Sequence, residues 1–116
     1  MDLHNYKRRF ERTLERIEES DISADDKEVI WMFKDYCLTQ NISWGKTERY
    51  LGDIVKLSRM LNRPIRKATK QDLMKVVAEL NQSELSESTK QCFKILLRKL
   101  YKLLRGIEGK GGIQKR

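Results

Sequence analysis

The sequence predicts an all-α protein, and two features of its pattern support this class. Apolar residues recur three and four positions apart in successive segments, and no stretch of useful length alternates between apolar and polar residues as a strand does. Short runs of Asn, Ser, Gly or Pro separate these segments and mark where helices end. At 116 residues, the chain is long enough for one compact domain and too short for two domains with separate cores.

The first segment, from about residue 2 to residue 20, is predicted to form a helix outside the core. It is heavily charged, as in "KRRFERTLERIEE", and its apolar stripe is narrow. Glu and Arg side chains at helical spacing stabilise one another on a solvated face. We therefore expect residues 1–22 to form a separate charged helix that docks loosely on the rest of the chain.

The second and third helices have recognisable boundaries. Ser23 can cap a helix that carries Asp25 and Asp26 in its first turn, where the helix dipole favours negative charge. The run "NISWGK" then breaks the pattern, and a third helix is expected from about residue 46 to residue 61. The only proline of the chain, Pro64, ends that helix.

The fourth and fifth helices are bounded in the same way. Thr69 can cap the fourth helix, "KQDLMKVVAEL", which has Asp72 in its first turn. Ser86 or Ser88 can cap the fifth helix, "STKQCFKILLRKLYKLLR". The helical core is thus expected over residues 23–105.

The last segment, "GIEGKGGIQKR", has the composition of a linker. Four glycines fall within seven residues after Arg105, which disfavours a rigid element. We expect residues 106–116 to be a Gly- and Lys-rich linker toward a domain absent from this sequence, so that the chain is one module of a longer protein. The alternative is a frayed basic tail on a complete small protein.

No group of residues in the sequence suggests catalysis or metal binding. The single histidine, His4, lies near the N-terminus, and the glycines lack the Lys-Ser/Thr ending of a phosphate-binding loop. Cys37 and Cys92 are far apart within apolar helical patterns, which favours packed thiols over a disulfide or a metal site. We therefore expect no catalytic residue, no metal, no cofactor and no small-molecule substrate.

The sequence also disfavours a membrane protein. No apolar run approaches the roughly 20 residues needed to span a bilayer. The N-terminal sequence "MDLHNYKRRFERT" lacks the apolar core of a signal peptide. We expect a soluble, cytoplasmic protein without a membrane partner.

Charge is distributed unevenly along the chain. The formal net charge is +8, composed of −3 over residues 1–42 and +11 over residues 43–116. A net charge of this size favours association with polyanions. Nucleic acid is therefore the preferred partner, with an anionic membrane second.

Two basic sets define the candidate binding residues. On the fifth helix, cations recur every four residues, where like charges repel by roughly 0.2 to 0.5 kcal/mol per pair, so an external anion is expected to offset them. On the third helix, a second basic set that includes Arg63 falls near one face, and the backbone N–H groups at the helix start suit a phosphate. A solvated lysine face is the alternative. The candidate DNA contacts are Lys46, Thr47, Arg49, Lys56, Thr89, Lys90, Lys94 and Arg98.

From residue 44 to residue 104, the chain resembles the N-terminal core-binding domain, also called SAM-like, of tyrosine recombinases and phage integrases. The matching segments are "KTERYLGDIVKLSRML", "ATKQDLMKVVAEL" and "SESTKQCFKILLRKLYKLL", and "DDKEVIWMFKDYCLTQNI" fits the first helix of that family. The first 20 residues are not part of the family pattern. The family positions are occupied here by Thr47, Tyr50, Thr69, Asp72, Leu73, Ser86 and Thr89.

The resemblance implies an orthogonal, SAM-like bundle of four core helices with an additional N-terminal helix. It further implies a module that grips one side of a double-stranded recombination site for DNA integration, while a larger C-terminal domain grips the other side. In that family the catalytic residues belong to the second domain, so this chain is expected not to be an enzyme, although its parent is a recombinase that self-associates on DNA. The alternatives are a free-standing module whose basic face binds an acidic protein, and an RNA-binding bundle.

Overall fold

The protein is an all-helical bundle, as the sequence predicts. The computed structural model describes residues 3–108, with side chains over residues 7–106, and no strand occurs in this part of the chain. Five α-helices and one 3-10 turn follow in the order α1 (Leu3–Glu18), α2 (Ala24–Thr39), α3 (Trp44–Met60), η1 (Ile65–Lys67), α4 (Lys70–Gln82) and α5 (Glu87–Glu108).

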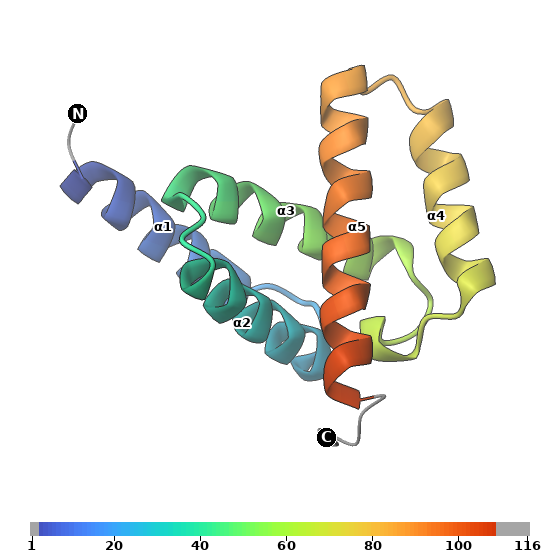
Figure 1. Ribbon diagram of the computed structural model, residues 1–116, viewed down its shortest axis with the longest axis horizontal. Helices are drawn as coiled ribbons and strands as arrows, with labels where there is room; N and C mark the ends of the chain where they lie inside the picture. The colour runs from blue at the N-terminus through green and yellow to red at the C-terminus, as the bar shows by residue number, and fades with distance from the viewer. Residues whose placement is uncertain (1–2, 109–116) are drawn as a thin grey trace.

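Helix α3 is the centre of the arrangement. It packs against α1 and α2 on one side, and α5 crosses it at a steep angle (Figure 1). Helix α4 lies beyond α5 and packs against it. The expected all-α bundle is therefore present, with the additional helix α1 at its N-terminus.

One apolar core joins the five helices, but α4 contributes least to it. Most of the fully buried side chains belong to α2, α3 and α5. On α4, Val76 and Leu80 are buried, whereas Leu73 and Val77 are half-buried and Met74 is 62% exposed. An apolar surface is therefore left beside α5 on the outside of the bundle.

Helix α1 is part of this core. Phe10 and Ile17 are buried, and the ring centroid of Phe10 lies 5.0 Å from that of Trp44 at the start of α3. The Thr13 hydroxyl donates a hydrogen bond to Glu48 Oε2 at 2.8 Å. The predicted loose docking of α1 is wrong, because Phe10 and Thr13 contact α3 directly and Ile17, on the same side of α1, is buried.

Side-chain caps fix the starts of α2, α3 and α4. Ser23 and Thr69 cap α2 and α4 as predicted, and Thr69 forms a reciprocal capping box with Asp72. Ser43 caps α3, which begins at Trp44, earlier than the predicted start at about residue 46. The glycine in its first turn does not prevent helix formation, because a side-chain cap there is worth about 1 kcal/mol, similar to the cost of the glycine.

The fifth helix has the predicted start and a later end. It follows Ser86, whose Oγ accepts a hydrogen bond from the Thr89 N–H at 3.1 Å. It continues to Glu108 and includes Gly106, because one glycine costs a helix only about 1 kcal/mol relative to alanine. Residues 109–116, the remainder of the predicted linker, lie outside the described residues.

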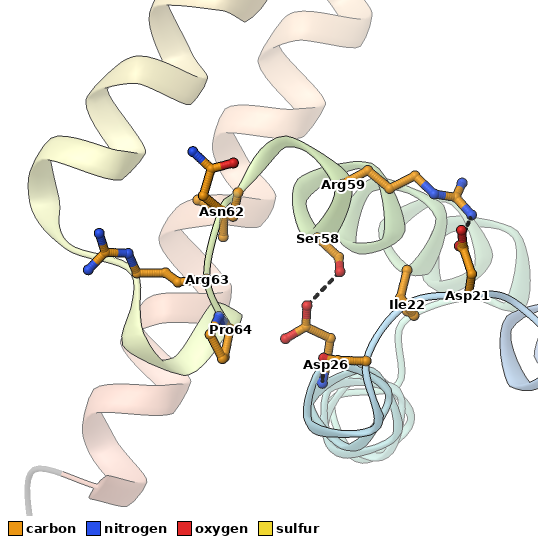
Figure 2. Close-up of a pocket in the computed structure, with 10 residues that line it drawn as sticks. Asp21, Ile22, Asp26, Ser58, Arg59, Asn62, Arg63 and Pro64 are labelled. Atoms are coloured by element: carbon orange, nitrogen blue, oxygen red, sulfur yellow. Dashed lines mark hydrogen bonds and ion pairs between the residues drawn. The ribbon is translucent and has the colours of Figure 1, made fainter.

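A buried carboxylate ties α2 to α3 and to the segment after it. Asp26 is 4% exposed; its Oδ2 accepts from the Ser58 hydroxyl at 2.5 Å and its Oδ1 from the Ile65 N–H at 2.9 Å. Figure 2 shows Asp26 turned toward Ser58. The Tyr101 hydroxyl of α5 donates to the Ile65 carbonyl at 2.9 Å, so α2, α3 and α5 all meet at η1.

Tyr101 is held in its protonated, donating form. Burial raises the pKa of its hydroxyl above the usual range, and the nearby carboxylates of Asp26 and Asp72 raise it further. The hydrogen bond from Tyr101 to η1 is therefore present throughout the physiological pH range.

Candidate nucleic-acid interface

Three exposed cations of α3 lie around two glycines. Arg49 and Lys56 are seven residues apart and share one side of the helix, and Lys46 lies next to them. Gly45 and Gly52 are exposed on this side, and a Cβ atom built at either glycine would meet no atom within 4 Å. Among the described residues, none of the three cations forms an ion pair within 4.0 Å. We call these five residues the α3 face.

Thr89 extends the α3 face to the start of α5. Arg49 Nη2 donates to Thr89 Oγ1 at 3.4 Å, and the Ser86 hydroxyl donates to the same atom at 2.9 Å. An anion bound at Arg49 would therefore lie beside the first turn of α5. Of the predicted site, the structure brings together Lys46, Arg49, Lys56 and Thr89.

The structure removes Thr47 from the predicted contact surface. Thr47 has no exposed surface, because it lies on the core side of α3, away from Arg49. Burial raises the pKa of the Cys37 thiol, and the neighbouring Thr47 hydroxyl partly offsets this effect. Thr47, which was predicted to contact DNA at the helix start, is thus a packing position in this chain.

Backbone groups predicted to be free for a phosphate are also engaged. The Lys46 N–H donates to Ser43 Oγ at 3.2 Å, and the Thr47 N–H donates to the Ser43 carbonyl at 2.9 Å. The N–H groups of Lys46 and Thr47 are therefore both bonded to Ser43. An anion at the α3 face cannot use the N–H groups of Lys46 and Thr47.

Two cations of the predicted basic sets already have partners within the protein. Arg63 lies beyond the end of α3, where its Nε pairs with Asp72 Oδ2 at 3.1 Å. Lys90 is only 8% exposed; its Nζ donates to the Asn81 carbonyl at 3.1 Å and pairs with Glu87 at 3.6 Å. Lys90 thus donates to a carbonyl near the end of α4. The prediction that Lys90 is an exposed DNA contact is wrong.

Lys94 and Arg98 lie on the side of α5 that faces α4, whereas Thr89 faces α3. They border a groove of about 680 Å³ between these two helices. Lys102 and Arg105 extend the same row, and their spacing of four and seven residues from Arg98 could have identified them in the sequence. We call this site the α4–α5 groove; it is lined by Leu73, Val77, Lys94, Leu97, Arg98, Tyr101, Lys102 and Arg105.

One carboxylate lies next to the α3 face. Asp53 is half-buried between Arg49 and Lys56 along the helix, and its Oδ2 is buried without a hydrogen-bond partner among the described residues. Burial raises the pKa of Asp53, and the charges of Lys56 and Arg49 only partly offset this effect. Asp53 therefore reduces the positive charge of the α3 face at neutral pH and costs stability there.

We expect Asp53→Asn to raise the free energy of unfolding at neutral pH. The pKa of Asp53 is higher in the folded state than in the unfolded state, where it is near 3.8. Asp53 therefore favours the fold while it is protonated at low pH, and this contribution is lost as the pH rises through the folded-state pKa. The advantage of the variant over the wild type should therefore shrink on acidification. Urea unfolding of both proteins between about pH 3 and pH 7 measures this difference. A variant less stable than the wild type at neutral pH would contradict the assignment.

A polar pocket of about 460 Å³ beside η1 offers no free charged group. Figure 2 shows Asp21 paired with Arg59, at 3.0 Å, and Asp26 bonded to Ser58. The hydrogen bond from Arg59 lowers the pKa of Asp21. Arg63, at the rim, is paired with Asp72 as described above. The charges lining this pocket are therefore used to hold the fold together.

Other kinds of site find no support in the described part of the chain. Between residues 7 and 106, no three His, Cys, Asp or Glu side chains gather as metal ligands, and no helix of residues 3–108 is long and apolar enough to cross a bilayer. No protein-family model matches the chain, and no curated protein or solved structure matches it either. The resemblance to recombinase core-binding domains therefore rests on the sequence segments quoted above.

Proposed function

We propose that this chain binds double-stranded DNA through the α3 face, as the DNA-gripping module of a site-specific tyrosine recombinase. The observation that carries this proposal is a row of exposed cations without internal ion pairs, set around two glycines and next to the first turn of α5. The resemblance to core-binding domains supplies the recombinase context.

The spacing of the cations suits a phosphate backbone. Arg49 and Lys56 are seven residues apart, which is roughly 10 Å along a helix axis. Phosphates of one DNA strand rise about 3.4 Å per step along the duplex axis and also wind around it, so two long, flexible cationic side chains at this separation can reach nearby phosphates of one strand. Gly45 and Gly52 add no side chain that would hold the duplex away from the helix.

Contacts of this kind give affinity without sequence reading. Lys and Arg contacts to phosphates position a protein on the duplex, whereas sequence is read at base edges in the grooves. We therefore expect the chain alone to bind duplex DNA weakly and with strong salt dependence. In a two-domain recombinase, effective concentration would strengthen this grip.

The experiment is a titration of a labelled duplex of about 20 base pairs, followed by fluorescence anisotropy over a series of salt concentrations. If three cations meet phosphates, the slope of log K against log salt should be about −2.7, so a fourfold rise in salt weakens binding about 40-fold. No binding at low salt, or binding indifferent to salt, would contradict the proposal. Stronger competition by duplex RNA would favour an RNA-binding bundle, and stronger competition by polyglutamate an acidic protein partner.

A further inference from the structure

The geometry points to the α4–α5 groove as a docking site for an acidic amphipathic helix of another protein. This surface is separate from the α3 face and does not depend on DNA binding. It combines an exposed apolar floor with a rim of positive charge, and both features are present in the folded chain without a partner.

The floor of the groove is apolar and continuous. Leu73, Val77 and Leu97 line it, and a second hollow of about 430 Å³ shares Leu73 and Val77 and continues over α4. Met74, which is 62% exposed, lies in that second hollow. Burying such apolar surface against a partner is favourable by roughly 25 cal/mol per Å² removed from water, so the floor favours an apolar occupant.

The floor is also preformed. The Tyr101 ring lines the groove while its hydroxyl is fixed by the hydrogen bond to the Ile65 carbonyl at 2.9 Å. A side chain held in place in this way loses little freedom when a partner binds.

The rim is uniformly positive. Five cations line the two hollows, and no acidic residue lines either of them. Among the described residues, none of the five forms an ion pair within 4.0 Å. The five are Lys70, Lys94, Arg98, Lys102 and Arg105.

The charge and shape of the groove select the occupant. The row from Lys94 to Arg105 spans eleven residues, or roughly 16 Å, which is about three turns of a facing helix. A helix with apolar residues on one side and Glu or Asp beside them would fill the floor and meet the cations at once. A phosphate backbone would meet the cations but leave Leu73 and Met74 exposed, so DNA fits this groove less well than it fits the α3 face.

The test is the binding of a labelled synthetic helix of about 16 residues, built from Leu, Ala and Glu with Leu and Glu at helical spacing. The double variant Arg98→Glu/Lys102→Glu should weaken its binding at least about tenfold, because two rim attractions become repulsions. The matched control Arg8→Glu/Arg12→Glu changes two exposed cations of α1 by the same charge and should leave the affinity within about twofold.

A scrambled peptide of the same composition separates docking from simple charge attraction, and it should bind at least about tenfold more weakly than the amphipathic one. Equal binding of the two peptides, or equal loss in the rim and control variants, would overturn the proposal. Charge reversals at Arg49 and Lys56 should leave peptide binding unchanged, so failure of this proposal and failure of the DNA proposal give different results. Self-association of the chain that excludes the peptide would assign the groove to a second copy and would also overturn it.

Discussion

Replacing Asp26 with alanine should lower the free energy of unfolding by about 3 to 5 kcal/mol, because two donors that bond to a buried charged acceptor lose it together. The donors are the Ser58 hydroxyl and the buried Ile65 N–H. Domains of this kind are stable by only about 5 to 15 kcal/mol. The variant should therefore be marginally folded at best, as measured by urea unfolding followed by circular dichroism.

Two further variants identify the cause of this loss. Asp26→Asn keeps an acceptor for Ile65 and a polar group facing Ser58, so it should lose clearly less stability than the alanine variant. Asp25→Ala removes an exposed carboxylate from the same helix turn and should cost less than about 1 kcal/mol. If Asp26→Ala cost no more than Asp25→Ala, the buried bonds would not be holding η1 in place.

Reversing two charges on the α3 face should weaken duplex binding by about a hundredfold at 0.1 M salt. Each phosphate contact contributes about 0.9 to the salt slope, which corresponds to about eightfold in affinity at 0.1 M salt relative to 1 M salt. Charge reversal also adds repulsion from the phosphates. The variant is Arg49→Glu/Lys56→Glu, and its slope should fall from about −2.7 to about −0.9. The measurement is the duplex titration described above.

The control for this variant must carry the same net charge. Lys7→Glu/Arg12→Glu reverses two exposed cations of α1 and changes the charge of the chain by the same amount. It should keep most of the salt slope, because α1 carries no part of the α3 face. If the two variants lost affinity equally, net charge rather than the α3 face would account for binding.

Local sequence features predicted most of the helical structure. Ser23 and Thr69 were recognisable caps, and the structure confirms both. For the fifth helix the sequence left Ser86 and Ser88 open, and the structure selects Ser86. Boundaries set by glycine were less accurate, since Gly45 and Gly106 both lie inside helices. A glycine lowers helix stability by an amount that a cap or a long packed helix can offset, so its presence alone does not mark an end.

Contacts between distant residues could not be predicted from the sequence. Asp26 was recognised as an acidic residue in a first helix turn, but its bonds to Ser58 and Ile65 span more than thirty residues. Thr47 was predicted to contact DNA because it lies at the start of the basic third helix, and only the packing of α3 shows that it is buried. The burial of Lys90 could not be predicted for the same reason, because its partner Asn81 is on another helix.

Helical spacing also identified the stripe on α5 without showing what it faces. Lys94 and Arg98 share a side of the helix, as predicted, but that side turns toward α4 and away from Thr89. Periodicity tells which residues of one helix lie together, whereas the neighbouring helix decides what surface they form. The sequence therefore predicted most of the basic residues of the candidate site, but not which of them form one surface.

Amide NMR spectra of the chain titrated with a short duplex would show directly which surface meets DNA. If the α3 face binds DNA, the largest shift changes should occur at Gly45, Lys46, Arg49, Gly52 and Thr89, with small changes along the α4–α5 groove. Changes confined to the α4–α5 groove, with none on the α3 face, would contradict DNA binding through the α3 face.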